Sequence, residues 1–237
     1  MYISRMNIKF TLSLLFILFI NFNVFADEYL WTGASSTSFN AAGNWTVLGL
    51  VPSDGPGSSD NITIPDVSGA SNIFPVTSQA ESVVAVTVNS GATLTLGSAD
   101  NFTVSGAFNA SAGTLTFTAA ANLILNGTVA SSGLGAFTES TGTVTYGSGS
   151  AQDIDSDDYH HLVISGGATK TSQGSVSVAG TLTVQAGATY DLVATTTTVT
   201  GTSTIAGTIN IDGSGVYDAN GDFAASGSIT MDGTARL

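Results

Sequence analysis

Hydrophobic and polar side chains alternate in short runs along most of the chain, from about Val83 onward. Each run has the order apolar, polar, apolar, and many of the runs follow a glycine and a small residue. Alternation with a period of two, rich in β-branched residues and bounded by glycine, predicts short β-strands. No stretch after Ala26 shows the periodicity of an amphipathic helix. We therefore expect an all-β protein, with strands centred on residues 94–96, 102–104, 115–117, 123–125, 144–146, 162–164, 176–178, 182–184, 209–211 and 229–231.

The runs recur at a nearly constant interval. Val104–Phe108 recurs at Leu125–Val129, and Gly207–Ile211 recurs at Gly227–Met231. A fixed period of about 20 residues indicates a solenoid, in which each coil buries its inward side chains against the next coil. We expect a β-solenoid with about 20–21 residues and three short strands per coil. The alternative is a β-sandwich, which also has many short strands.

Two places depart from this interval. Leu115 and Val144 are 29 residues apart, and the excess of about eight residues predicts that Ser131–Ser140 leaves the wall as an extruded loop. The acidic segment Asp153–Tyr159 predicts a second extruded loop.

Residues 27–82 differ from the repeats of residues 83–237. They contain both tryptophans and all four prolines, and they show no repeat. The end of a solenoid exposes strand edges and an open core, so it needs a cap. We interpret residues 27–82 as an N-terminal cap, in which Trp31 and Trp45 plug the core; stacking on sugar rings is the alternative. At the other end residues 229–231 form an ordinary repeat, so we expect further repeats past Leu237, or a partner protomer, to cover it.

Residues 1–26 form a predicted secretory signal peptide. Arg5 and Lys9 precede an apolar run, and Val24-Phe25-Ala26 places short side chains at a cleavage site. The alternative is a membrane anchor, but Asn21 and Asn23 interrupt the run, which is shorter than the about 20 residues that span a bilayer. We expect a secreted or cell-surface protein with no stable membrane insertion after cleavage.

Charge and composition exclude several functions. Lys170 and Arg236 are the only Lys or Arg residues after position 26, against 17 Asp and Glu, so the mature chain has a net charge of −15. Such a chain lacks the clustered cations that bind nucleic acid. The absence of cysteine excludes disulfides, zinc–thiolate sites, thiol nucleophiles and iron–sulfur clusters.

Several short phrases of the sequence stand out beside the repeat: Trp31-Thr32-Gly33, Asn44-Trp45, Pro52, Asp60, Ile62–Pro65, Val144–Gly147, Gln152, Ile154, Tyr159–Ile164, Ala179–Val184 and Gly187–Thr189. These phrases resemble a family of secreted, repeat-rich, adhesin-like parallel β-helix surface proteins of Bacteroidetes-type bacteria. The resemblance covers most of residues 29–237 and implies a right-handed parallel β-helix with a cell-surface or secreted role. It implies no catalytic set.

Two acidic clusters are candidate calcium sites. Asp153, Asp155, Asp157 and Asp158 alternate like the start of a calcium loop, but Asp158 stands where that loop has glycine, and Ile164 where it has glutamate. Asp218, Asn220 and Asp222 repeat the pattern, with Phe223 in place of glycine. We expect two solvated loops, with weak calcium binding as the alternative, and we assign no metal-binding, cofactor-binding or catalytic residue.

The remaining candidates for chemistry have simpler explanations. His160 and His161 are the only histidines, and neighbours on a strand point to opposite faces, so one metal could not easily take both. Polysaccharide-cleaving β-helix enzymes combine carboxylates with a basic residue, for which only Lys170 and Arg236 are available. The many threonines are expected to be the outward members of ordinary strands; an ice-binding ladder is the alternative.

These observations predict a structural or adhesive surface module rather than an enzyme. A stiff, acidic rod would present loops and repeated weak contacts to an extracellular surface or glycan, and it would gain strength by multivalency. The alternative is a carbohydrate-binding or polysaccharide-cleaving β-helix protein.

Overall fold

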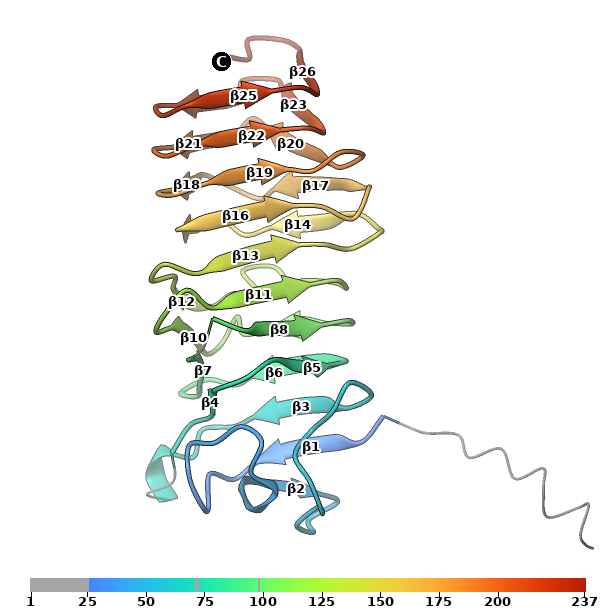
Figure 1. Ribbon diagram of the computed structural model, residues 1–237, viewed down its shortest axis with the longest axis vertical. Helices are drawn as coiled ribbons and strands as arrows, with labels where there is room; N and C mark the ends of the chain where they lie inside the picture. Colours follow the sequence, from blue (N-terminus) through green and yellow to red (C-terminus); the bar gives the residue numbers. More distant parts are fainter. Residues whose placement is uncertain (1–25, 71–72, 98) are drawn as a thin grey trace, which may run out of the picture.

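The computed structural model describes residues 26–70, 73–97 and 99–237. The strands wind into a parallel β-solenoid, so the predicted fold is confirmed and the β-sandwich is excluded (Figure 1). The coil is right-handed: the strands nearest the viewer run from left to right as the chain climbs. In the described part of the chain, no helix is long and apolar enough to cross a bilayer. The predicted signal peptide, apart from Ala26, lies outside the described residues.

One wall runs without interruption through most of the solenoid, and we call it the long wall. Its strands pair in parallel, one per coil. They are β5 (Glu81–Val83), β8 (Asn101–Val104), β11 (Asn122–Leu125), β13 (Thr143–Tyr146), β16 (His161–Ile164), β19 (Leu182–Val184), β22 (Ser203–Ile205) and β25 (Phe223–Ala225).

The other two sides are each divided into a lower and an upper sheet. The lower sheets contain β1 (Glu28–Trp31), β2 (Trp45–Val47), β3 (Asn61–Ile64), β6 (Ala85–Val88) and β9 (Phe108–Asn109) on one side, and β4 (Val76–Thr77), β7 (Thr93–Leu96), β10 (Thr114–Phe117) and β12 (Ala136–Thr138) on the other. The upper sheets contain β14 (Gln152–Ile154), β17 (Thr169–Ser172), β20 (Thr189–Val193), β23 (Thr208–Asp212) and β26 (Ser228–Met231), and β15 (Asp158–Tyr159), β18 (Val176–Val178), β21 (Thr196–Val199) and β24 (Val216–Ala219).

The strand register corrects two predictions about loops. Leu115 pairs with Phe137 on one wall, whereas Val144 lies on the long wall, so the wide spacing of Leu115 and Val144 is no slip of the period. Within Ser131–Ser140, Ala136–Thr138 forms β12 and stays in the wall. The expected extrusion of Asp153–Tyr159 is wrong, because this segment contains most of β14 and all of β15.

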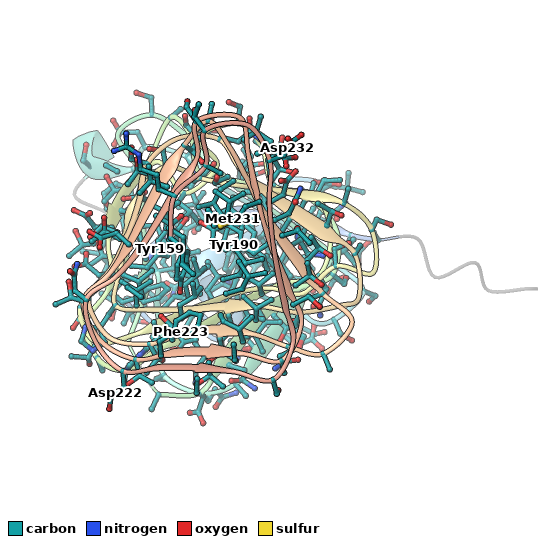
Figure 2. All side chains as sticks on the ribbon, turned by 90° about the horizontal axis from the view of Figure 1, so that it is seen from above. Tyr159, Tyr190, Asp222, Phe223, Met231 and Asp232 are labelled. Atoms are coloured by element: carbon teal, nitrogen blue, oxygen red, sulfur yellow. The ribbon has the colours of Figure 1, made fainter. Side chains whose placement is uncertain are left out.

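The core is built from the inward members of each strand. On the long wall Phe102, Leu123 and Val144 stack one above another in register and are buried. Thr103 and Thr145 lie between the inward positions and are partly exposed, which confirms that these threonines are outward members of ordinary strands. Figure 2 looks down the axis and shows Tyr159 and Tyr190 inside the walls and Asp222 and Asp232 on the outside.

The N-terminal segment contributes both to the stack and to its closure. β1 and β3 pair in parallel and β3 pairs with β6, so regular stacking begins at Glu28. β2 is antiparallel to β1 and follows a 3₁₀ turn at Ala42–Asn44; a second such turn spans Ser68–Ala70. Trp31 and Trp45 are buried, with ring centroids 4.9 Å apart, which confirms that they pack in the core. At the other end, Phe223 and Met231 are 40% and 48% exposed.

Candidate functional site

A seam crosses the solenoid between the coil that contains β12 and the coil that contains β14 and β15. The lower sheets end at β9 and β12, and the upper sheets begin at β14 and β15. Val129 still forms a bridge with Phe108 below it, but in the described residues neither Val129 nor β12 pairs with a strand of the coil above. Only the long wall carries its backbone ladder across the seam, from β11 through β13 to β16.

On one side of the seam a glutamine side chain takes the place of backbone pairing. Gln152 lies in β14 and points inward. Its amide nitrogen donates to the carbonyl oxygens of Leu125, at 2.9 Å, and Gly127, at 2.6 Å. Its amide oxygen accepts the N–H of Ser148 at 3.0 Å. One side chain thereby joins the two coils and satisfies buried polar groups of both.

On the other side an aspartate holds the loop below. Oδ2 of Asp155 accepts the N–H of Leu134 at 2.7 Å. Asp155 is 3% exposed, and its Oδ1 is buried without a hydrogen-bond partner among the described residues. Burial raises the pKa of Asp155, while the N–H groups of Leu134, Ser132 and Gly133 act in the opposite direction.

Two tyrosines connect Asp155 to the core. The N–H of Asp155 donates to the Tyr146 hydroxyl at 3.2 Å, and the Tyr159 hydroxyl donates to the carbonyl oxygen of Asp155 at 3.0 Å. The two hydroxyls are 3.0 Å apart, so Tyr146 donates to Tyr159. Burial raises the pKa of both phenols, which keeps them protonated and able to donate.

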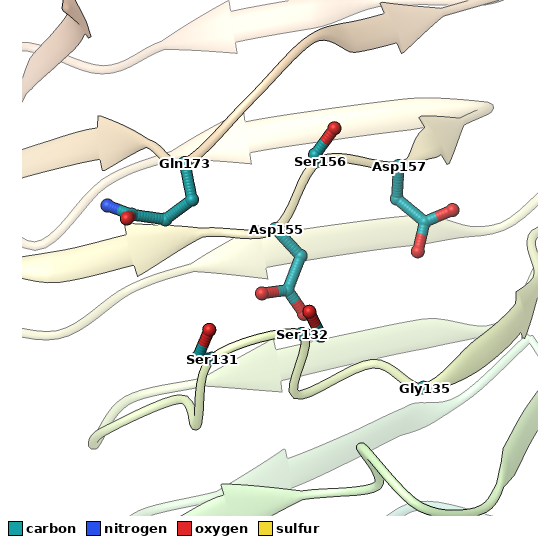
Figure 3. A pocket seen from close by; sticks show the side chains of 7 residues that line it. All are labelled: Ser131, Ser132, Gly135, Asp155, Ser156, Asp157 and Gln173. Atoms are coloured by element: carbon teal, nitrogen blue, oxygen red, sulfur yellow. The ribbon is translucent and has the colours of Figure 1, made fainter.

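A polar hollow of about 310 Å³ opens at this side of the seam (Figure 3). Asp155 and Asp157 reach down from the upper coil. One oxygen of Asp155 is directed toward Ser132, and the other faces the space between Ser131 and Gln173. Burial and the neighbouring carboxylates raise the pKa of Asp157 to about 6. The hollow is lined by Ser131, Ser132, Gly135, Asp155, Ser156, Asp157 and Gln173.

The structure separates the members of the first acidic cluster. Asp155 is buried, contrary to the expectation of a solvated loop, because it accepts the backbone N–H of Leu134 in the loop below. Asp157 is partly buried beside it. Asp153 is exposed and accepts from the Gln173 amide at 2.8 Å, and Asp158 is exposed.

The second acidic cluster lies on the surface near the C-terminal end. Asp218 and Asp222 are exposed, and the Asn220 amide donates to Asp218 at 3.3 Å. In the part of the chain that the structure describes, no group of three or more His, Cys, Asp or Glu side chains converges in a way that could hold a metal ion.

The histidines do not point to opposite faces as expected. β16 begins at His161, so His160 precedes the strand, and the two rings meet edge to face with centroids 4.4 Å apart. Nδ1 of His161 accepts the N–H of Thr181 at 3.0 Å and also contacts the Thr181 hydroxyl. These contacts across adjacent coils place His161 in a structural role.

Lys170 and Gln152 are inward polar residues whose roles the sequence analysis missed. Lys170 is 0% exposed, and its Nζ donates to the carbonyl oxygens of Ser148, at 2.8 Å, and Ser150, at 3.2 Å. Burial lowers its pKa. The available signal was a polar residue at an inward position of a strand, as in Gln152-Asp153-Ile154.

Comparison with known proteins gives one family match. The model of a family described as a domain of unknown function, DUF8693, matches residues 30–160. The matched range covers the lower sheets, the seam and both carboxylates of the hollow. No match is found among curated proteins or among solved structures.

Proposed function

The chain belongs to the DUF8693 family, and we propose that it works as a secreted or cell-surface structural and adhesion module. In this function the solenoid is a stiff support, and its outer rows of side chains and its loops make repeated weak contacts with an extracellular surface or glycan. Contacts repeated on one rigid body act together, so that their avidity exceeds the affinity of each contact.

The observation that carries the proposal is the repetition of polar side chains along one wall. Parallel register places Asp153, Thr171 and Asp191 in one outward column, which continues through Asn210 and Thr230. Strands of a sheet are about 4.8 Å apart, so this column repeats at that interval. The Asn210 amide donates to Asp191, at 3.0 Å, and to Asp212, at 2.9 Å, which fixes the orientation of these groups.

The N-terminal pattern and the charge support a site of action outside the cell. The positive start, the apolar run and the short side chains before Asp27 are typical of a signal peptide. The strongly acidic mature chain resists adhesion to anionic membranes by repulsion. A cell that expresses the full chain should export a product that begins at Asp27, which N-terminal sequencing of the culture fluid or surface fraction would test.

Adhesion is tested with beads that carry the chain at increasing density. We expect retention on bacterial cells or immobilised polysaccharides to rise more steeply than density, since multivalent contacts act cooperatively. Beads with an unrelated protein of similar net charge are the control. Beads that bind no tested surface at the highest density would contradict the proposal. Release of soluble oligosaccharides from the polysaccharide would instead support the polysaccharide-cleaving alternative.

A further inference from the structure

We propose that the hollow at the seam binds a calcium ion, which the carboxylates of Asp155 and Asp157 hold together with oxygen atoms of the loop Ser131–Gly135. The proposal does not depend on the adhesive function. It concerns what joins the two coils where two walls lack backbone pairing.

Asp155 has one buried carboxylate oxygen without a hydrogen bond. The side chain is 3% exposed, and its Oδ2 is bonded to the Leu134 N–H, whereas its buried Oδ1 has no hydrogen-bond partner among the described residues. The N–H groups of Ser132 and Gly133 lower the pKa of Asp155 without forming a hydrogen bond to Oδ1. Burying part of a carboxylate without a partner is costly, and buried charges in proteins are normally paired or bound to metals. A cation in the hollow would supply the missing partner.

The charges that surround the hollow are negative. The charge of Asp153 acts on Asp155, and those of Asp158 and Glu139 act on Asp157. The basic side chains that follow this segment are His160, His161 and Lys170. The His160 ring packs edge to face on His161, His161 accepts from Thr181, and Lys170 donates to backbone carbonyls. The hollow therefore has negative charge on several sides, with no protein cation to balance it among these contacts.

The side chains that line the hollow offer mainly oxygen atoms as ligands. Two carboxylates, the hydroxyls of Ser131, Ser132 and Ser156 and the Gln173 amide line a hollow of about 310 Å³. No histidine or cysteine lines it, so the donor set does not suit zinc. Calcium takes 6–8 oxygen ligands in flexible geometry, whereas magnesium demands a near-ideal octahedron. With only two carboxylates, the other ligands would be neutral oxygens and water.

Such an ion would act as a cross-link between coils. Asp155 and Asp157 belong to the upper coil, and the loop Ser131–Gly135 belongs to the lower one. The ion would add a bond between them at the turn between β14 and β15, in addition to the bonds that Gln152 makes. We expect it to stabilise the folded state, because a ligand that binds only the native protein raises the free energy of unfolding with the logarithm of its concentration above Kd.

The site is tested with terbium, a luminescent substitute for calcium. The Tyr159 hydroxyl is bonded to the backbone of Asp155, so excitation of tyrosine should sensitise an ion bound here. The chain is titrated with terbium at pH 7.5 and then with calcium. We expect one saturable site and displacement by calcium with a Kd on the order of 10⁻⁴ to 10⁻³ M, as in extracellular modules. Calcium at about 100 times its Kd should raise the Tm by about 5–10 °C.

Variants locate the ion. Asp157→Asn should weaken terbium and calcium binding at least about tenfold, because the charge of the ligands sets affinity. Asp155→Asn should do the same while keeping an acceptor for the Leu134 N–H. Asp218→Asn, in the exposed second cluster, is the matched control and should bind as the unchanged chain does. Circular dichroism checks that each variant folds, and Asp157→Asn, at the rim, carries the test if the buried Asp155→Asn variant does not fold.

Three outcomes would overturn the proposal. The first is the absence of saturable emission from the unchanged chain. The second is equal affinity in the unchanged chain and in Asp157→Asn. The third is loss of the signal in Asp218→Asn, which would assign the ion to the surface cluster.

Discussion

Asn44 illustrates how one buried amide organises the N-terminal turn. Its side-chain oxygen accepts the N–H groups of Ser35 and Ser36, both at 2.8 Å. Its amide nitrogen donates to the Ser36 hydroxyl and to the carbonyl oxygen of Ser38. The side chain is 0% exposed, so water could not replace these partners if the amide were removed.

Replacing Asn44 should therefore destabilise the protein. We expect Asn44→Ala to lower the free energy of unfolding by about 2–4 kcal/mol, since it leaves several buried backbone groups without partners. Urea denaturation measures the change. Asn101→Ala, at an exposed position, is the control and should shift stability by less than about 0.5 kcal/mol. Equal effects of the two substitutions would show that the amide network contributes nothing.

Asp157 gives the seam a dependence on pH in the absence of divalent cations. Its pKa is raised from 3.8 to about 6 by burial and by the carboxylates of Asp155, Asp158 and Glu139. The folded state thus binds more protons than the unfolded state between these values, so stability falls as the pH rises through them. Solvent screening reduces the contribution to about 1 kcal/mol.

The pH effect is measured by thermal unfolding in a chelator from pH 4 to pH 7. Asp157→Asn should lose less stability over this range than the unchanged chain, because it removes the group that titrates. Asp153→Asn, an exposed neighbour, should keep the original pH profile. If Asp157→Asn has the same dependence of stability on pH as the unchanged chain, the raised pKa assigned to Asp157 is contradicted.

At the scale of elements, glycines at one corner allow successive coils to lie directly on one another. A Cβ added to Gly201 would overlap the carbonyl oxygen of Gly180 below, and one added to Gly221 would overlap that of Gly201. The same relation joins Gly127 to Gly106 lower in the stack. The glycines that mark the repeat in the sequence are thus required by close backbone approach.

This packing predicts a large effect of one methyl group. Gly201→Ala should lower the free energy of unfolding by about 2–3 kcal/mol, because the backbone of adjacent coils must move apart. Gly69→Ala is the control, since a Cβ there meets no atom of the described residues within 4 Å. Urea denaturation of both variants compares them. A Gly201 variant as stable as the Gly69 variant would mean that the corner can open without cost.

The positions of the strands could be predicted from the sequence, because the alternation of inward and outward side chains is a property of each strand by itself. Leu94-Thr95-Leu96 and Leu123-Ile124-Leu125 lie in strands. In each triplet the first and last side chains point inward and are buried. The assignment of strands to walls could not be predicted in the same way. Leu115 and Val144 have similar surroundings in the sequence, yet they lie on different walls, because the wall depends on how the whole coil closes.

At the scale of the whole molecule, the long wall holds two stacks together. Its ladder crosses the seam, while the other two sides rely on Gln152 and Asp155. Fewer backbone hydrogen bonds join the coils here than elsewhere, so local opening should require less free energy at the seam.

Hydrogen exchange tests this weakness directly. Gln152→Ala should speed amide exchange in residues 126–142 and 147–160, because it removes the bonds to Leu125 and Gly127. Residues of β22 and β23, far from the seam, should exchange at the original rate. Gln185→Ala, at an exposed position, is the matched control. Faster exchange throughout the chain would instead indicate global destabilisation.

The strand class, the period and the solenoid follow from the amino-acid sequence alone, because alternation and glycine corners are local properties that every coil repeats. It also indicated that the tryptophans close the core, since large aromatic side chains outside the repeat need a place to be buried. The seam and its hollow were decided by the tertiary structure. Asp155 and Leu134 are 21 residues apart, and the roles of Asp155 and Gln152 depend on the coil beneath them. From its sequence alone, an acidic segment is predicted to be exposed to solvent. In the folded protein Asp155 is buried instead, because it accepts a backbone N–H of the coil beneath.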